Sequence, residues 1–83
     1  MRVVVSQRAA EQLAAAPDNI ARTFFKQLAH LLRDRSHPSL DAKKYPESAD
    51  PDLWQARITK AWRFYFKIEG DLYNITNATE HPK

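Results

Sequence analysis

Two arginines on consecutive predicted strands are the leading candidates for chemistry in this 83-residue chain. Arg57 lies in an alternating run over residues 53–59, and Arg63 lies in a second such run over residues 62–68. Alternation places both side chains on the face away from the core. Two guanidinium groups on one face, with Lys67 beside them, can each donate two hydrogen bonds to a phosphate. The same pattern fits a solvated face whose charges pair with neighbouring acids, and both interpretations stay open.

Tyr65 lies between two of these cations on the same predicted face. Aromatic rings interleaved with cations suit single-stranded nucleic acid, because bases stack on the rings while the cations neutralise phosphates. Lys43 and Lys44, in the preceding segment, either extend this basic surface or belong to a soluble loop. The pattern therefore favours an anionic polymer as a ligand, with cross-strand packing of Tyr65 as the alternative.

His81, close to the C-terminal end, is the candidate for proton transfer. Its unperturbed pKa of about 6.5 suits acid–base work at neutral pH if the tail returns along the sheet to the arginines. Otherwise it is an idle terminal residue.

The charge distribution supports one basic surface. The chain has 13 Lys and Arg against 10 Asp and Glu, a formal net charge of +3. Residues 53–68 contain cations and no acid, whereas the acids of the second half lie before, between or after the predicted strands. Acids at the turns and bases along the strands predict a basic sheet face.

The first half of the chain predicts a short strand followed by a helical hairpin. Residues 3–5 are all valine, and Ser6 can cap a helix over residues 7–16. A second helix is expected from Asp18, as its N-cap, to near Arg35. Its apolar residues recur at helical spacing and form one stripe: Ile20, Phe24, Leu28, Leu31 and Leu32.

The second half predicts an irregular loop over residues 36–52 and then three strands. The third strand covers residues 72–78 and follows a tight turn that contains Gly70, the only glycine. The expected fold is α+β, with a short N-terminal strand and a two-helix hairpin packed on an antiparallel sheet that has a C-terminal three-stranded meander. Residues 1–83 are expected to form a single domain.

Composition excludes several functional classes. The chain has no cysteine, so a disulfide scaffold, a cysteine zinc site and a thiol nucleophile are ruled out. The three histidines lack close metal-ligand spacing, so neither a metal nor another cofactor is expected. The N-terminal residues form neither a signal peptide nor a membrane span, and the sequence predicts a cytoplasmic protein without membrane contact.

The order of these elements, taken with the residues themselves, resembles the RelE/ParE superfamily of toxins from type II toxin–antitoxin systems. The likeness is sharpest over residues 53–66, where an aromatic residue, an Arg-Ile pair, a short turn and an aromatic-Arg pair precede an apolar run. The closing Glu80-His81-Pro82-Lys83 is similar to the family's terminal basic cluster, and Ala42-Lys43-Lys44-Tyr45 is similar to its lysine-containing loop.

The resemblance implies an endoribonuclease that binds in the decoding site of the 30S ribosomal subunit and cuts mRNA without a metal, by attack of a 2′-hydroxyl on phosphorus. Arg63 matches the arginine that contacts the reacting phosphate, and His81 matches the catalytic histidine of the YoeB-like branch. The implied RNA-binding residues are Lys43, Lys44, Arg57, Tyr65, Lys67 and Lys83. Gln55 replaces a lysine of the RelE branch, and Glu47 is a loose substitute for the catalytic glutamate of the YoeB branch.

Two other functions remain open from the sequence. A ParE-like protein with the same fold would inhibit DNA gyrase, and a basic binding module would hold RNA or protein without catalysis. In either toxin interpretation the implied partner is a cognate antitoxin, an acidic and partly disordered protein that forms a hetero-oligomer with the toxin.

Overall fold

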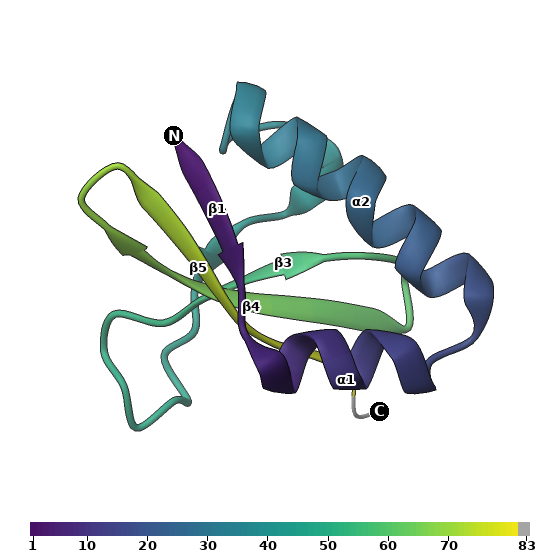
Figure 1. The fold of residues 1–83 in the computed structure, drawn as a ribbon. Coiled ribbons are helices and arrows are strands. Elements are labelled where there is room, and N and C mark those ends of the chain that lie inside the picture. Colours follow the sequence, from purple (N-terminus) through teal and green to yellow (C-terminus); the bar gives the residue numbers. More distant parts are fainter. Residues whose placement is uncertain (82–83) are drawn as a thin grey trace.

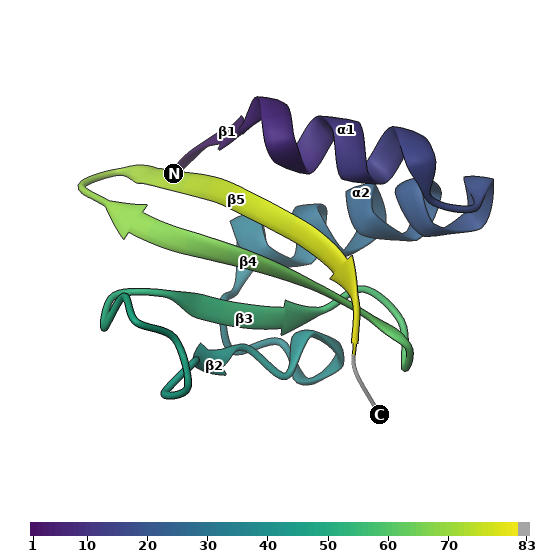
Figure 2. The same cartoon turned by 90° about the horizontal axis from the view of Figure 1, so that it is seen from below.

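The protein has two layers, with two helices on one face of a five-stranded sheet of order β1-β5-β4-β3-β2 (Figures 1 and 2). The structure is a computed structural model and describes residues 1–81. The elements, in chain order, are β1 (Arg2–Val5), α1 (Gln7–Ala15), α2 (Asp18–Arg33), the 3₁₀ helix η1 (Pro38–Leu40), β2 (Lys43–Lys44), β3 (Trp54–Arg57), β4 (Trp62–Glu69) and β5 (Leu72–Glu80). The predicted α+β architecture is confirmed. No helix in these residues is long and apolar enough to cross a membrane.

The sheet is mixed, because β1 pairs with β5 in parallel while all other neighbours are antiparallel. Ser6 joins β1 to the helical layer: its Oγ accepts a bond from the Ala9 N–H at 3.0 Å and donates one to the Thr76 carbonyl at 2.9 Å. The predicted cap is therefore present, and it also ties the start of α1 to β5. Where β1 ends, α1 continues along β5, and the Ala78 N–H donates to Gln12 Oε1 at 2.8 Å.

The second helix begins and ends close to the predicted positions. The prediction of Asp18 as the N-cap was wrong by one residue, because Pro17 is the N-cap and Asp18 lies in the first turn. The negative charge of Asp18 is favourable there, at the helix N-terminus. The predicted stripe is buried except for Leu32, which is 43% exposed. Each helical residue is rotated by about 100° from the one before it, so Leu31 and Leu32 cannot both face the core.

The segment expected to be irregular contains two short elements, η1 and β2. β2 is paired with β3, Lys43 opposite Gln55 and Lys44 opposite Trp54. A two-residue strand is too short to show an alternating pattern, so the sequence signal for it is absent. The prediction of an unstructured stretch over residues 36–52 was wrong at this point.

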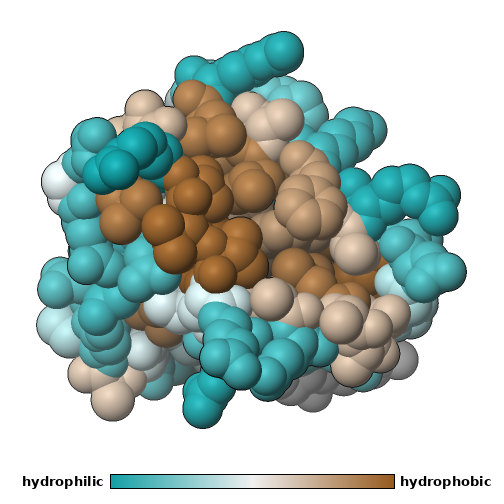
Figure 3. All heavy atoms as spheres, in the orientation of Figure 1, coloured by the Kyte–Doolittle hydropathy of each residue, from teal (hydrophilic) through white to brown (hydrophobic). Residues whose placement is uncertain are grey.

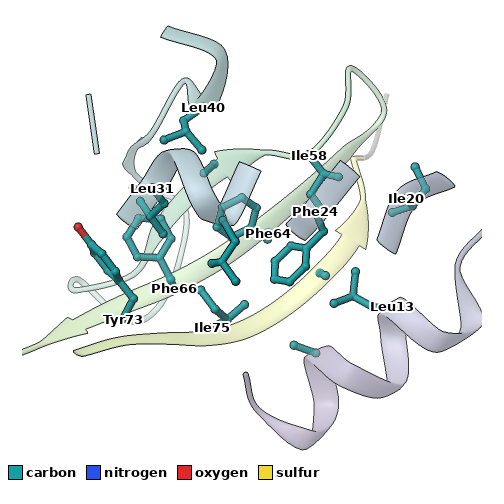
Figure 4. Close-up of a cluster of buried hydrophobic side chains, with 14 residues drawn as sticks. Leu13, Ile20, Phe24, Leu31, Leu40, Ile58, Phe64, Phe66, Tyr73 and Ile75 are labelled. Carbon is teal, nitrogen blue, oxygen red and sulfur yellow. The ribbon is translucent and has the colours of Figure 1, made fainter. Parts of the chain in front are cut away.

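The core lies between the helices and the sheet, and aromatic rings pack there among aliphatic side chains (Figure 4). Phe24 of α2 meets Phe64 of β4 edge to face, with 5.3 Å between ring centroids, and Phe66 meets Tyr73 in the same way at 5.5 Å. The residues predicted to face inward on the last three strands are buried, apart from Trp54 and Ile68 at the margin. Gly70 has φ +63° in the β4–β5 turn, as its position suggested.

Candidate nucleic-acid interface on the sheet

The face of the sheet away from the helices, called here the open face, holds the two candidate arginines side by side. Arg57 of β3 is paired directly with Arg63 of β4, and Arg63 is paired with Thr79 of β5. The next residues along the strands, Ala56 and Phe64, are fully buried, so the row of Arg57, Arg63 and Thr79 points away from the core.

Arg63 is held by one nitrogen of its guanidinium group, and the described residues leave the opposite edge of that group free. Its Nη1 donates to the carbonyl oxygens of Thr59 at 2.7 Å, Lys60 at 3.2 Å and Trp62 at 3.1 Å. Within residues 1–81, its Nε and Nη2 make no hydrogen bond. Together these two nitrogens form a complete guanidinium edge, the geometry that binds two phosphate oxygens at once. The β3–β4 turn thus orients Arg63 without occupying that edge.

Arg57 and Lys43 share one acidic partner. Asp41 Oδ2 lies 3.8 Å from Arg57 Nη2 and 3.7 Å from Lys43 Nζ. Asp41 follows η1 with a left-handed backbone, φ +46°, a conformation that aspartate tolerates better than most residues. The end of η1 therefore places a carboxylate between two cations of the open face.

The loop between β2 and β3 supplies two further acids. Lys67 Nζ lies 2.7 Å from Asp50 Oδ2, and Lys44 Nζ lies 4.0 Å from Asp52 Oδ1. The hydrogen bond between Lys67 and Asp50 raises the pKa of the lysine and lowers the pKa of the aspartate, so both stay charged at neutral pH. Of the two interpretations that the sequence left open, pairing with neighbouring acids therefore applies to Lys67 and Lys44, because the loop path brings these carboxylates to the bases.

Lys43 and Lys44, which are adjacent in β2, lie on opposite sides of the sheet. Lys43 is paired with Gln55, whose side chain belongs to the open face, whereas Lys44 is paired with Trp54, which packs against the core. Lys44 Nζ lies 5.5 Å from the centre of the Trp54 ring. Lys43 is therefore brought to the arginine row and Lys44 is not.

Tyr65 has an aromatic neighbour that sequence reasoning missed. Its ring centroid lies 5.3 Å from that of Tyr45, and both residues are half-buried. Tyr45 is held here because its N–H donates to the Leu53 carbonyl at 2.9 Å, one step beyond β2. Burial raises the pKa of the Tyr65 hydroxyl, while a hydrogen bond with Thr79 opposes that shift. The pair offers an aromatic surface on which a base can stack.

His81 lies at the end of the sheet that carries the arginine row. Its N–H donates to the Ala61 carbonyl at 2.6 Å, which adds one bond beyond the end of β5, and its side chain is exposed. It lies two positions after Thr79, the residue opposite Arg63. His81 is thus held beside the β3–β4 turn, at the end of the sheet where Arg63 lies. Lys83 lies outside the described residues.

Gln27 is a buried polar residue that sequence reasoning overlooked. It is 4% exposed, and its Nε2 donates to the carbonyls of Ser39 at 3.0 Å and Arg57 at 2.9 Å. It therefore fixes the backbone of Arg57 against α2 and η1. The available signal was its spacing, three residues after Phe24, which puts it on the buried side of the helix.

Two buried polar atoms of β3 have no hydrogen-bond partner in the described part of the chain, Gln55 Oε1 and Arg57 Nε. Both belong to side chains of the open face, where a ligand with donors and phosphate oxygens would satisfy them. A shallow cleft of about 250 Å³ lies at the same end of the sheet, lined by Gln12, Ala15, Trp62, Ala78, Thr79 and Glu80. In residues 1–81 no three His, Asp or Glu side chains are grouped so that they could hold a metal ion.

Comparison with known proteins gives the fold. No family model and no curated protein matches the sequence. The YoeB dimer from Staphylococcus aureus is similar over 99% of this chain and 98% of its own, with TM-score 0.79 and 14% identity. The YoeB/ParE toxin from Agrobacterium tumefaciens is similar over 99% and 100%, with TM-score 0.78 and 14% identity. The RelB–RelE antitoxin–toxin complex from Methanococcus jannaschii contains a chain similar over 93% and 88%, with TM-score 0.73 and 14% identity. The resemblance to RelE/YoeB proteins is thereby confirmed for the fold.

Proposed function

We propose that this protein is the toxin of a type II toxin–antitoxin system and cleaves mRNA while that mRNA is bound in the ribosomal decoding site. The observation that carries the proposal is Arg63, whose Nε–Nη2 edge makes no hydrogen bond within residues 1–81. Arg63 lies in a row with Arg57 and Thr79, at the end of the sheet where His81 follows β5. The fold that it shares with YoeB and RelE proteins supports the same assignment.

The reaction needs one charge-stabilising group and proton transfer at two oxygens. The 2′-hydroxyl loses its proton and bonds to the adjacent phosphorus, and the bond from phosphorus to the 5′-oxygen breaks as that oxygen takes up a proton. The Arg63 edge donates to the phosphate oxygens as negative charge accumulates on them. His81 exchanges the proton, acting as base or acid according to its protonation state. Tyr65 stays protonated because its pKa is raised, so it serves as a hydrogen-bond donor and stacking surface.

The proposed partners are an antitoxin protein and the ribosome with its mRNA. The support for the antitoxin is that structural neighbours include toxins solved together with antitoxins, as in the RelB–RelE complex. The support for RNA is the combination of Arg57, Lys43 and the tyrosine pair beside Arg63. Lys67 and Lys83 complete the proposed RNA-binding set, and Lys44, which the sequence also suggested, would contact RNA only from the edge of the sheet at β2.

The test is an in vitro translation reaction with purified protein, in which mRNA ends are mapped by primer extension beside a ribosome-free control. We expect breaks within the codon being decoded that depend on ribosomes. Arg63→Ala should reduce the cleavage rate by about 100-fold or more, the usual effect of removing a charge-stabilising donor. Arg63→Lys should remain strongly impaired, because an ammonium group lacks the bidentate edge.

Matched variants give this test its controls. His81→Ala should slow cleavage by about 100-fold, whereas Lys60→Ala, which removes a cation from the neighbouring turn, should leave the rate near that of the unchanged protein. Normal cleavage in both Arg63→Ala and His81→Ala would contradict the proposal.

A ParE-like action on DNA gyrase is the second candidate. It is favoured by the ion pairs of the open face, since Asp41 and Asp50 already neutralise part of the charge that RNA would require. Inhibition of gyrase supercoiling by the purified protein, with intact mRNA in the translation reaction, would establish this candidate instead.

A further inference from the structure

The outer side of α2 carries apolar side chains that the sheet does not use. Phe25, Ala29 and Leu32, called here the outer stripe, follow one another at spacings of four and three residues and therefore lie on one side of the helix. Phe25 is 60% exposed and Leu32 is 43% exposed, and they are two of the most exposed large apolar residues. In Figure 3 apolar atoms gather over β1 and the neighbouring part of α2, with hydrophilic atoms around them. Apolar surface concentrated in this way is typical of an interaction site.

Three cations flank the outer stripe on one side. Arg22, Lys26 and Arg33 are exposed; Lys26 directly follows Phe25, and Arg33 directly follows Leu32, so each is rotated by about 100° in the same direction. Across residues 1–81, none of the three is within ion-pair distance of a carboxylate. These positive charges are therefore available to a partner, unlike those of Lys43, Arg57 and Lys67.

The apolar centre and the positive flank of this surface indicate which kind of partner can bind it. Leucines and aromatic residues on one side of a helix can cover Phe25 and Leu32, and acids along the flank of that helix can pair with the three cations. A second copy of this chain fits poorly, because α2 packed on α2 would bring the same three positive charges together. RNA fits poorly as well, because the centre of the surface is a phenylalanine and a leucine rather than a row of donors.

We propose that the outer stripe of α2 and its flanking cations bind an acidic amphipathic helix of a partner protein. The inference takes from the proposed function only the expectation of an acidic protein partner. It places that partner on the helical layer rather than on the open face of the sheet. The open face then stays available for its own ligand unless another part of the partner covers it.

The experiment uses the purified full chain labelled with ¹⁵N and two synthetic helical peptides of equal length. Both carry leucines at i, i+3, i+4 and i+7; one has glutamates on its flanks and the other has lysines there. We expect the glutamate peptide to bind and to shift amide resonances of residues 21–33, and the lysine peptide to bind at least tenfold more weakly. Phe25→Ser and Lys26→Glu should each reduce the affinity for the glutamate peptide about tenfold, as expected for anchors of a small interface.

Two controls separate the possible outcomes. Val4→Ser removes an apolar side chain of similar exposure, 49%, from the other side of the sheet and should leave binding unchanged. Arg63→Ala should bind the peptide normally, so loss of mRNA cleavage and loss of peptide binding report on different sites. No binding, shifts confined to the strands, a dimer that Phe25→Ser dissociates, or an RNA oligonucleotide that shifts the resonances of α2 would each overturn the proposal.

Discussion

The open face of the sheet and the outer side of α2 are both basic, yet they differ in how many of their cations are paired with a carboxylate. On the sheet, Arg57 and Lys43 meet Asp41, and Lys67 meets Asp50. On α2, the described residues provide no carboxylate to pair with Arg22, Lys26 or Arg33. A cation that is already paired binds an anion only by exchanging partners. Cations without a carboxylate partner among the described residues, Arg63 on the sheet and the three on α2, attract an anion directly.

The two regions also differ in what surrounds their charges. The sheet places cations beside half-buried tyrosines, a setting for stacking and phosphate contact. The helix places them beside exposed Phe25 and Leu32, a setting for another amphipathic helix. Net charge alone therefore does not identify the ligand, because the apolar neighbours of each cation decide which anion fits.

The largest effect on stability should come from removing the hydrogen bonds by which Gln27 of α2 holds the strand that carries Arg57. Gln27→Met keeps the length of the side chain but removes its hydrogen bonds to the Ser39 and Arg57 carbonyls. We expect a loss of about 2–3 kcal/mol in the free energy of unfolding, because buried carbonyls are left unpaired, measured by urea denaturation. Gln7→Met is the control, since Gln7 is exposed and its side chain bonds only to Glu11 among the described residues. Equal stability of the two variants would mean that Gln27 does not hold the arginine strand.

A moderate effect should follow when a cation of the sheet loses its acidic partner and becomes unpaired, like the cations of α2. Asp50→Asn removes the partner of Lys67 without changing its size. We expect the affinity for single-stranded RNA to rise about two- to fivefold, since an exposed ion pair contributes up to about 1 kcal/mol. Fluorescence anisotropy over a salt series measures this, and the dependence on salt should become steeper.

The matched control for this variant is Asp71→Asn. Asp71 pairs with Arg2 at 3.4 Å in an exposed position away from the arginine row. An equal gain in RNA affinity from both variants would show that overall charge matters and that the Lys67–Asp50 pair does not.

The smallest effect concerns pH and the C-terminal end of α2. His30 and His37 stack with 3.9 Å between ring centroids, and burial, followed by the charge of His37, lowers the pKa of His30. The unfolded chain therefore binds the proton more readily, so this contribution to stability is complete above about pH 6.5 and decreases as the pH falls through the lowered pKa. The urea midpoint should be slightly lower at pH 5.5 than at pH 7.5. A His30→Gln variant should show a smaller difference, and an unchanged difference would exclude this histidine as the cause.

Much of the fold could be predicted because its signals are local. Alternation along β4 identified Phe64 and Phe66 as core residues, and both are fully buried. Ser6 as a cap and Gly70 in a turn follow from backbone preferences that do not depend on distant residues. The two-residue strand β2 was not predicted, because it is too short to show an alternating pattern. The exposure of Leu32 was not predicted, because neighbouring helical positions differ by a rotation of about 100°, which is enough to separate a core position from a surface position.

The sequence by itself determined which side chains share a face, since strand and helix periods act between near neighbours. It thereby determined that Arg57 and Arg63 lie on one side of the sheet and that Phe24 faces the core. Only the tertiary structure decided which charges on those faces are free. Asp41 and Asp50 reach the sheet because of the path of the chain around β2, and within residues 1–81 the cations of α2 meet no such acid. Ion pairing depends on distances between segments far apart in the chain, and no local period encodes those distances.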